Sequence, residues 1–293
     1  MKHCMLIDNE TGEVIDENFR IDELEDQERK RKMAEKDRLS REFKEKQSEY
    51  LGNFIFYIFK NIENFKDILT DADLVKFIFC GTYIKHNGAL MLDNNTTYID
   101  KKRLNELLQV SNTIFNRFYK KLIKNKLILE ENNKIYINLN IFWRGKKTEY
   151  KKITKIKLKD FTRIYIKTAR ELYLNYKNKN HKKLAMIYKL IPFLNWKYNI
   201  LCSNPNEENK NNIDALTIED IMDELNYSKS NITRFKHDFY SLKYNDYQIF
   251  KTLQSDENYK NSIILVNPLV IYGGNDINNL QYLINLFNIK PLH

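Results

Sequence analysis

Glycine and proline are scarce in this sequence, with 7 and 4 of 293 residues respectively. So few turn-forming residues argue against a Gly-rich β-sandwich and against a nucleotide-binding sheet, whose phosphate loop needs closely spaced glycines. Aromatic residues are abundant instead, with 19 Tyr and 17 Phe. The composition therefore predicts a mainly α fold with small β-hairpins, of the α+β class.

Cysteines and long apolar runs are also few. Cys4, Cys80 and Cys202 lie too far apart for a metal pair and are too few for a disulfide framework, so we expect reduced thiols in a cytoplasmic protein. The longest apolar candidate, YLGNFIFYIF, is half of the roughly 20 residues that cross a bilayer. We expect no signal peptide and no membrane partner.

Residue patterns of known catalytic sites are missing as well. The five histidines are scattered, and neither the His pair of a nicking endonuclease nor the Arg, His and Tyr pattern of a recombinase is visible. The acidic residues Asp71 and Asp73 fit helix capping. We therefore expect no enzyme activity, no cofactor and no metal.

Positive charge is concentrated in one part of the chain. Residues 101–190 contain 25 Lys and Arg against 6 Asp and Glu, whereas 1–100 and 191–293 are both net acidic. A codon bias that favours lysine would act on the whole chain, so it does not explain one basic block between two acidic ones. Such a block is typical of a surface that neutralises nucleic-acid phosphates.

The first 100 residues predict a sequence of short elements. Residues 4–16 read as a hairpin, and 17–50 as a solvated charged helix, with a partner-binding arm as the alternative. Residues 53–65 and 70–84 read as two helices, the second capped by Thr70, and 88–92 as a short strand.

Residues 100–143 predict two helices and a hairpin. Asp100 caps the first helix, whose apolar stripe is Leu104, Leu107 and Leu108. Ser111 caps the second helix, which is expected to end with Asn125 in a left-handed conformation. Its expected core-facing residues are Ile114, Phe115, Phe118, Leu122 and Ile123. Two strands around the turn Glu131–Asn133 follow, so the pattern is that of a winged helix-turn-helix.

The same pattern occurs a second time. With an offset of 117 residues, DKKRLNELLQVSNTIFNRF (100–118) matches TIEDIMDELNYSKSNITRF (217–235). With an offset of 129, INLNIFWRG (137–145) matches VNPLVIYGG (266–274), and we expect the 12 extra residues in the second hairpin. Two helices at the start of the second unit, from residue 161 onward, are expected to match 53–84.

We therefore expect tandem winged helix-turn-helix domains. The predicted divisions are a hairpin and charged arm at 1–49, a first winged-helix domain at 50–148, a second with a basic lead-in at 149–275, and a closing helix and tail at 276–293.

These motifs resemble the RepL-type plasmid replication initiators of Firmicutes and related winged-helix proteins of Firmicute phages. In that group a reading helix that ends in a Leu-Ile pair precedes a wing strand in an INP-like context, here Ile137–Leu139 and Val266–Pro268. The resemblance covers about 90–147 and 214–275. It implies double-stranded DNA binding at an origin or operator without catalysis. RepL-type proteins are shorter and carry one such unit, so initiation itself stays open.

The second helix of a helix-turn-helix enters the major groove, so its polar residues are the first candidates for DNA contact. Arginine suits guanine and asparagine suits adenine, which makes Arg117 and Asn116 the expected base readers. The alternative is a merely solvated helix face. The candidate residues of the first unit are Asn112, Thr113, Asn116, Arg117, Lys120, Lys121, Lys124, Lys101, Lys102, Arg103, Lys134, Arg144, Lys146 and Lys147.

The second unit offers weaker candidates, because acidic residues surround them and reduce phosphate affinity. They are Lys229, Ser230, Asn231, Thr233 and Arg234, with Lys177, Lys179, Lys182 and Lys183 as a further phosphate-binding group or a solvated helix junction. This unit is expected to bind DNA lightly or to bind protein.

Three functions remain open at this point. The first is a plasmid or phage replication initiator, and the second is a phage transcriptional regulator. The third is a winged-helix scaffold for protein interaction. A homodimer or a host replication or transcription protein is a possible further partner.

Overall fold

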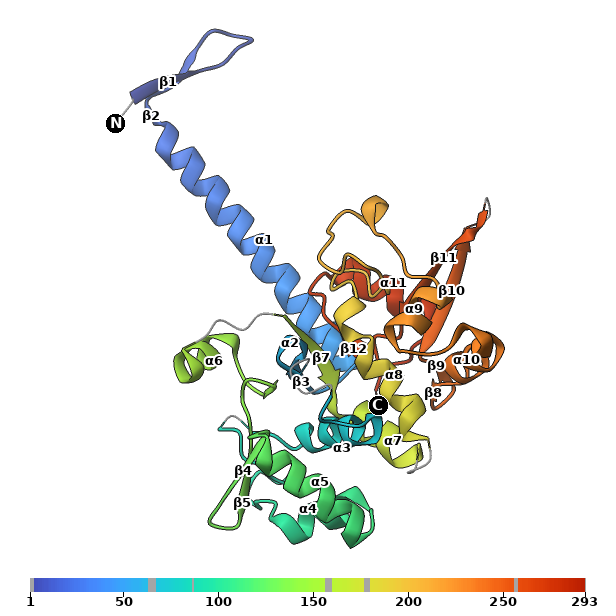
Figure 1. The fold of residues 1–293 in the computed structure, drawn as a ribbon. Helices are drawn as coiled ribbons and strands as arrows, with labels where there is room; N and C mark the ends of the chain where they lie inside the picture. The colour runs from blue at the N-terminus through green and yellow to red at the C-terminus, as the bar shows by residue number, and fades with distance from the viewer. Residues whose placement is uncertain are drawn as a thin grey trace.

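The computed structural model describes residues 3–62, 67–85, 87–155, 160–176, 180–255 and 258–292. Helices and strands are mixed along the chain, so the predicted α+β class is confirmed. A long helix projects from the body of the molecule, which contains the other helices, several hairpins and a small sheet (Figure 1).

The sheet at the centre has four strands in the order β12–β7–β3–β6, and every neighbouring pair is antiparallel. Its inner strands are β3 (Phe54–Ile58) and β7 (Phe161–Tyr165), and its outer strands are β6 (Phe142–Trp143) and β12 (Ile271–Tyr272). Each unit of the repeat thus contributes one inner and one outer strand to a single sheet.

The register of this sheet is symmetric about one residue pair, Phe56 opposite Arg163. On the outer sides Phe56 pairs with Trp143, and Arg163 pairs with Tyr272. Trp143 and Tyr272 are equivalent in the repeat, so Phe56 and Arg163 are equivalent too. The two units are therefore related by a local two-fold axis that passes between β3 and β7.

Both strands correct an expectation, because residues 53–58 and 161–165 were predicted to be helical. The apolar runs FIFYI and FTRIY are short and rich in aromatic and β-branched residues, which fits a buried strand equally well. The longest pairing of each strand is with the other unit, more than 100 residues away, so local periodicity could not decide between the two structures.

The first unit continues from β3 through short helices to a hairpin. Its elements are α2 (Phe59–Ile62), α3 (Asp71–Gly81), α4 (Lys101–Leu108), α5 (Asn112–Lys124), β4 (Ile128–Glu131), β5 (Lys134–Ile137) and, after β6, α6 (Lys147–Thr154). The expected cap Thr70 accepts a hydrogen bond from the backbone N–H of Asp73. The expected strand at 88–92 is a series of single bridges, one of which joins Ala89 to Tyr136 of β5.

The second unit repeats this order with some changes. Its helices are α7 (Ile166–Asn175), α8 (His181–Lys189), α9 (Ile218–Glu224), α10 (Ile232–Tyr240) and, after β12, α11 (Ile277–Leu286). Three short 3-10 segments lie at Ile191–Phe193, Lys210–Asn212 and Lys229–Asn231. Its strands are β8 (Lys243–Tyr244), β9 (Tyr247–Gln248), β10 (Phe250–Ser255) and β11 (Asn258–Val266).

One asparagine makes the same contacts in both units. The Asn138 amide donates to the carbonyl of Lys126 at 3.2 Å, and its Oδ1 accepts from the N–H of Asn140 at 2.9 Å. Asn267 donates to Gln248 and accepts from Leu269, each at 2.9 Å. In both cases the asparagine follows the hairpin, and its side chain ties that segment to a residue two positions before the first strand of the hairpin. This contact explains the asparagine in the repeated motif.

The 12 extra residues of the second unit lie in two places, not one as expected. The backbone N–H of Asn138 donates to the carbonyl of Leu127, and that of Asn267 donates to the carbonyl of Ile249. Leu127 and Ile249 are therefore equivalent, so the offset has risen from 117 to 122 before the hairpin begins. That part of the insertion forms the small pair β8–β9. The remainder, up to an offset of 129, lengthens the hairpin β10–β11.

The equivalence of the two asparagines gives a prediction about stability. Asn267 is fully buried, whereas Asn138 is partly exposed. Because loss of a buried side-chain donor and acceptor leaves backbone groups unsatisfied, Asn267→Ala should lower the free energy of unfolding by about 2–3 kcal/mol and Asn138→Ala by about 1 kcal/mol. Urea denaturation of both variants checks the order, and equal losses would contradict it.

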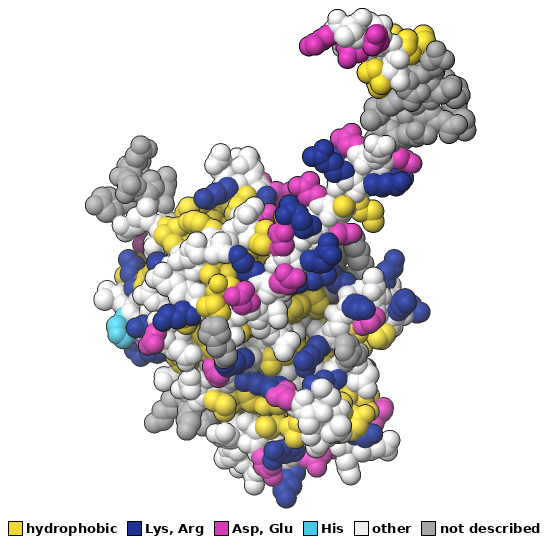
Figure 2. Space-filling model, turned by 180° about the vertical axis from the view of Figure 1, so that it is seen from behind, with side chains coloured by type: hydrophobic (Ala, Val, Ile, Leu, Met, Phe, Trp, Pro, Cys, Tyr) yellow, Lys and Arg dark blue, Asp and Glu magenta, His cyan; other side chains and the backbone are white. Residues whose placement is uncertain are grey.

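The N-terminal residues form a projecting arm. The hairpin of β1 (His3–Ile7) and β2 (Val14–Arg20) is confirmed, and α1 (Ile21–Tyr50) follows it directly. The C-terminal end of α1 packs against α11, where Phe43 and Gln47 are buried. Figure 2 shows apolar side chains on the hairpin. Met5 and Ile15, which belong to the hairpin strands, are exposed.

Candidate nucleic-acid interface

The candidate interface begins with helices α4 and α5, whose expected N-caps are both confirmed. The Asp100 carboxylate accepts from the N–H of Arg103 at 2.7 Å, and the Ser111 hydroxyl accepts from that of Ile114 at 3.4 Å. Gln109, with φ of 52°, provides the left-handed residue that ends α4 and turns the chain into α5. The two caps and this turn fix where the second helix starts.

The end of α5 differs from the expectation by one residue. Asn125 has φ of −96°, and its side chain donates to the carbonyl of Lys121 at 2.8 Å. Lys126 takes the left-handed conformation, with φ of 56°. The asparagine side chain satisfies a free carbonyl of the last turn, so the following residue makes the change of direction.

The buried face of α5 is narrower than expected. Phe115, Phe118 and Leu122 are buried as predicted, but Ile114 and Ile123 are 37% and 39% exposed. Tyr119 is buried in addition, and its hydroxyl donates to the Glu130 carboxylate on β4 at 2.6 Å. The ring thus fixes the helix against the hairpin.

The hairpin β4–β5 has a two-residue loop. Asn132 and Asn133 have φ of 51° and 59°, which is the geometry of the tight hairpin turn that asparagine favours. The Nζ of Lys134, next to this turn, lies 4.0 Å from the centroid of the Tyr98 ring. Lys134 is therefore partly buried at the base of the loop rather than extended at its tip.

The outer face of α5 is exposed and carries most of the predicted contact residues. Thr113, Asn116, Arg117, Lys120 and Lys124 are all exposed. Within the described residues Arg117, Lys120 and Lys124 form no ion pair, so their charges face solvent. Asn112 is also exposed, but its Oδ1 accepts from the Asn105 amide at 2.6 Å, which ties it to α4.

Lys121 has a different role from its neighbours. Its ammonium lies 2.5 Å from the buried Asp73 carboxylate, which also pairs with the buried Lys76 at 2.9 Å. Burial raises the pKa of Asp73, but hydrogen bonds from Lys121 and Lys76 outweigh it and hold that pKa below its ordinary value. Lys121 was predicted to meet phosphate, and it instead fastens α5 to α3.

The N-terminus of α4 lies beside α5 and adds three basic residues. The Lys101 ammonium lies 5.1 Å from the centroid of the Tyr119 ring, and Lys102 is exposed. Arg103 pairs with Glu106 at 2.8 Å. Lys101 and Lys102 therefore extend the basic face of α5, whereas the charge of Arg103 is partly neutralised.

The three candidate residues that follow the hairpin belong neither to α4 nor to α5. Arg144 is partly buried, and the pKa of its guanidinium is lowered mainly by burial. Lys146 is exposed as the N-cap of α6, and the Lys147 ammonium lies 4.4 Å from the centroid of the Phe161 ring. Lys146 and Lys147 are thus both exposed, Lys147 beside an aromatic ring, whereas Arg144 is partly buried.

Two of the five candidate residues at the outer helix of the second unit, Lys229 and Ser230, have side-chain partners. Lys229 lies 3.0 Å from Asp223, and the Ser230 hydroxyl lies 2.8 Å from that of Ser228. Asn231 precedes α10 without a capping side-chain bond, while Thr233 and Arg234 are exposed. Lys183 pairs with Asp238 at 2.6 Å, and Lys177 and Lys179 lie outside the described residues.

The start of the second unit's outer helix also differs from its counterpart. Residues 229–231 form a 3-10 turn, and the α-helix begins only at Ile232, whereas α5 is helical from Asn112. The two outer faces thus differ in geometry as well as in charge. This difference is consistent with the lighter DNA contact expected of the second unit.

Comparisons with known proteins do not place the chain in a family: no family model, no curated protein and no solved structure matches it. The resemblance to RepL-type initiators therefore stays a prediction that rests on short motifs. Among the described residues, no helix is long and apolar enough to cross a membrane, and no group of His, Cys, Asp and Glu could hold a metal ion.

Proposed function

We propose that the two units are tandem winged helix-turn-helix domains and that the first binds double-stranded DNA in a sequence-specific manner. The support is the order of elements on one core: in the first unit a capped helix, a left-handed turn, a second capped helix and a hairpin follow one another, and the second unit has the same order without a side-chain cap on its second helix. In such a unit the second helix, here α5, lies in the major groove.

The observation that carries the proposal is the charge of the outer face of α5. The helix contains one arginine and three lysines and no acidic residue, and only Lys121 has an acidic partner among the described residues. A helix face that is only solvated can carry acidic and basic residues alike. On a surface that faces phosphates, acidic residues would repel the ligand and weaken binding.

The positions along α5 suggest separate roles. Thr113, Asn116 and Arg117 lie in its N-terminal half, which would approach the base edges. Lys120 and Lys124, with Lys101 and Lys102 of α4, would lie along the phosphates. This mode of action is binding without catalysis, and it requires no cofactor.

Selection of bound duplexes from a random pool tests the role of Arg117. If Arg117 reads a guanine, the Arg117→Ala variant should lose preference at one position of the site and about 1–3 kcal/mol of binding free energy there. The matched control is Arg234→Ala, the equivalent change in the second unit, which should leave the selected site nearly unchanged.

Two other results would be decisive. A uniform loss of affinity over all sequences would assign Arg117 to phosphate rather than to a base. Absence of any selected duplex with the wild-type protein would contradict DNA binding and favour the alternative in which these units bind protein.

The biological role proposed for this binding is initiation of plasmid or phage replication, with phage transcriptional regulation as the alternative. Both roles use the same contacts, and each is compatible with a homodimer or a host replication or transcription protein as a further partner. The location of the selected site in an origin or in a promoter separates the two roles.

A further inference from the structure

A cavity of about 350 Å³ lies beside the central sheet, and no residue of α5 lines it. Its walls come from β7, from the start of α6 and from segments of the second unit. Apolar and aromatic residues form much of the wall: Phe59, Phe161, Ile191, Pro192, Leu194 and Trp196. Pockets of this size hold small organic ligands.

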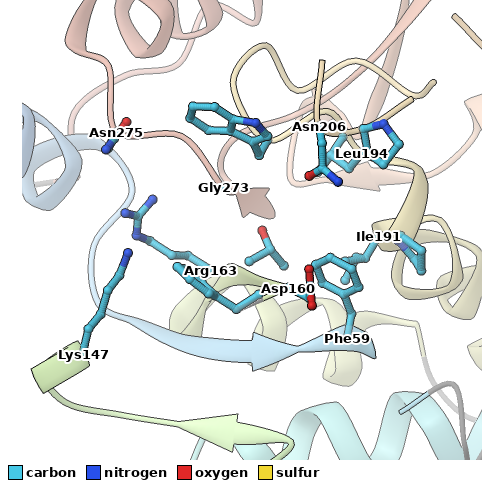
Figure 3. A pocket seen from close by; sticks show the side chains of 14 residues that line it. Phe59, Lys147, Asp160, Arg163, Ile191, Leu194, Asn206, Gly273 and Asn275 are labelled. Atoms are coloured by element: carbon cyan, nitrogen blue, oxygen red, sulfur yellow. The ribbon is translucent and has the colours of Figure 1, made fainter. Parts of the chain in front are cut away.

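Positive charge is gathered at one end of this cavity. Arg163 and Lys147 both line it, and Figure 3 shows the two side chains extending toward Asn275. Arg163 is only 7% exposed and donates to the carbonyl oxygens of Gly274, at 2.5 Å, and Tyr272, at 3.4 Å. Within the described residues no carboxylate pairs with either cation.

Polar groups at the same site also have no partner within the structure. The Nε of Arg163 and the hydroxyl of Thr162 are buried without a hydrogen bond, and both residues line the cavity. Buried polar atoms are almost always satisfied in native proteins. Partial burial lowers the pKa of Lys147, and the neighbouring positive charge of Arg163 lowers it further, so the two cations repel each other.

The repeat shows that the fold does not require a cation at this position. Arg163 is equivalent to Phe56 in the first unit, and the two residues occupy the same register in the same sheet. In the first unit an uncharged phenylalanine occupies this position of the sheet. On the other side the arginine lies between the rings of Phe43 and Phe54, at 5.6 and 5.4 Å from their centroids. A role in ligand binding explains the difference.

We propose that this cavity binds a small phosphomonoester with a flat apolar body, of the size and chemistry of a nucleoside monophosphate. A phosphomonoester carries close to two negative charges at neutral pH, which matches the two cations. The phosphate would lie between Lys147 and Arg163, and the flat body between the aromatic walls. Asp160, which lies beside Phe59 in Figure 3 and pairs with Lys60 at 3.7 Å, would repel an anion and accept from hydroxyl or amino groups.

Calorimetric titration of the full chain tests this assignment with AMP, adenosine and inorganic phosphate as probes. AMP should bind at one site per chain, phosphate should bind more weakly, and adenosine should not bind measurably. Lys147→Met and Arg163→Phe should each weaken AMP binding at least tenfold. Arg163→Phe copies the residue of the first unit, and Lys147 lies in an exposed position, so both variants should fold.

The matched control is Lys151→Met, which removes an exposed charge from the same helix but not from the cavity wall. It should bind AMP like the wild type. A second control, Lys120→Ala with Lys124→Ala, should keep AMP binding while losing DNA affinity, which separates this site from the proposed DNA-binding face. The assignment is overturned if millimolar AMP does not bind, or if Lys147→Met and Lys151→Met bind it equally. Phosphate that binds as tightly as AMP would overturn the flat-bodied ligand.

Discussion

Asp73→Asn is expected to lower the free energy of unfolding by about 3–5 kcal/mol, the cost of breaking a buried ion pair from one side. The carboxylate is the shared partner of Lys76 and Lys121, and both Asp73 and Lys76 are almost completely buried. The variant leaves the Lys76 charge in the interior without compensation and detaches α5 from α3. Urea denaturation at neutral pH measures the loss.

The same group predicts how stability depends on pH. The pKa of Asp73 is lower in the folded protein than its ordinary value of 3.8. The ionised carboxylate therefore contributes stability at pH values above the unfolded pKa of about 3.9, and this contribution is lost as the pH falls through the lower folded pKa. The difference in stability between wild type and Asp73→Asn should be constant above about pH 5 and should shrink below pH 4.

Asp71→Asn is the matched control for both measurements. Asp71 lies in the same first turn of α3 and pairs with Lys189 at 3.3 Å, but both side chains are about one-third exposed. Exposed pairs contribute about 0–1 kcal/mol, so this variant should be only slightly destabilised. A loss in Asp73→Asn no larger than that in Asp71→Asn would show that the buried cluster does not hold α5 in place.

Replacing Lys101, Lys120 and Lys124 together by alanine is expected to reduce affinity for the selected duplex by about a hundredfold at 0.15 M salt. Each lysine that neutralises a phosphate contributes about 0.9 to the slope of log K against log salt. The slope of the triple variant should therefore be shallower by about 2.7. Fluorescence anisotropy over a range of salt concentrations measures both quantities.

A triple variant of the arm controls for the change in net charge. Lys30, Lys36 and Lys44 are exposed on α1, outside the proposed interface. Their replacement by alanine should leave the slope almost unchanged. If both triple variants reduce the slope equally, the protein binds DNA through its overall charge and not through the face of α5.

Local signals in the sequence predicted the helical caps and the hairpins well. Asp100, Ser111 and Thr70 cap the helices that they were expected to cap, because a capping side chain bonds a backbone N–H only three residues away. The hairpin loop at Asn132 and Asn133 follows from the same kind of short-range preference. The offset of 117 residues between the two units was also visible, because it aligns these short capping and turn motifs.

Long-range contacts account for what the sequence did not predict. The strands β3 and β7 were interpreted as helices because each depends on a partner from the other unit. Lys121 was grouped with Lys120 and Lys124, since its pairing with Asp73, 48 residues earlier, has no signal in the sequence. The cavity was missed for the same reason, although a lone arginine within the apolar run FTRIY was a visible anomaly.

The pairing of Phe56 with Arg163 has a consequence for the history of the chain. A protein with one unit could complete this sheet only by association of two identical copies, with the same side chain on both sides of the dyad. Once the two copies are joined in a single gene, the residues at the dyad can mutate separately. A Phe opposite an Arg is an asymmetry that a dimer of identical chains cannot have, whereas a single chain that carries both units can have it.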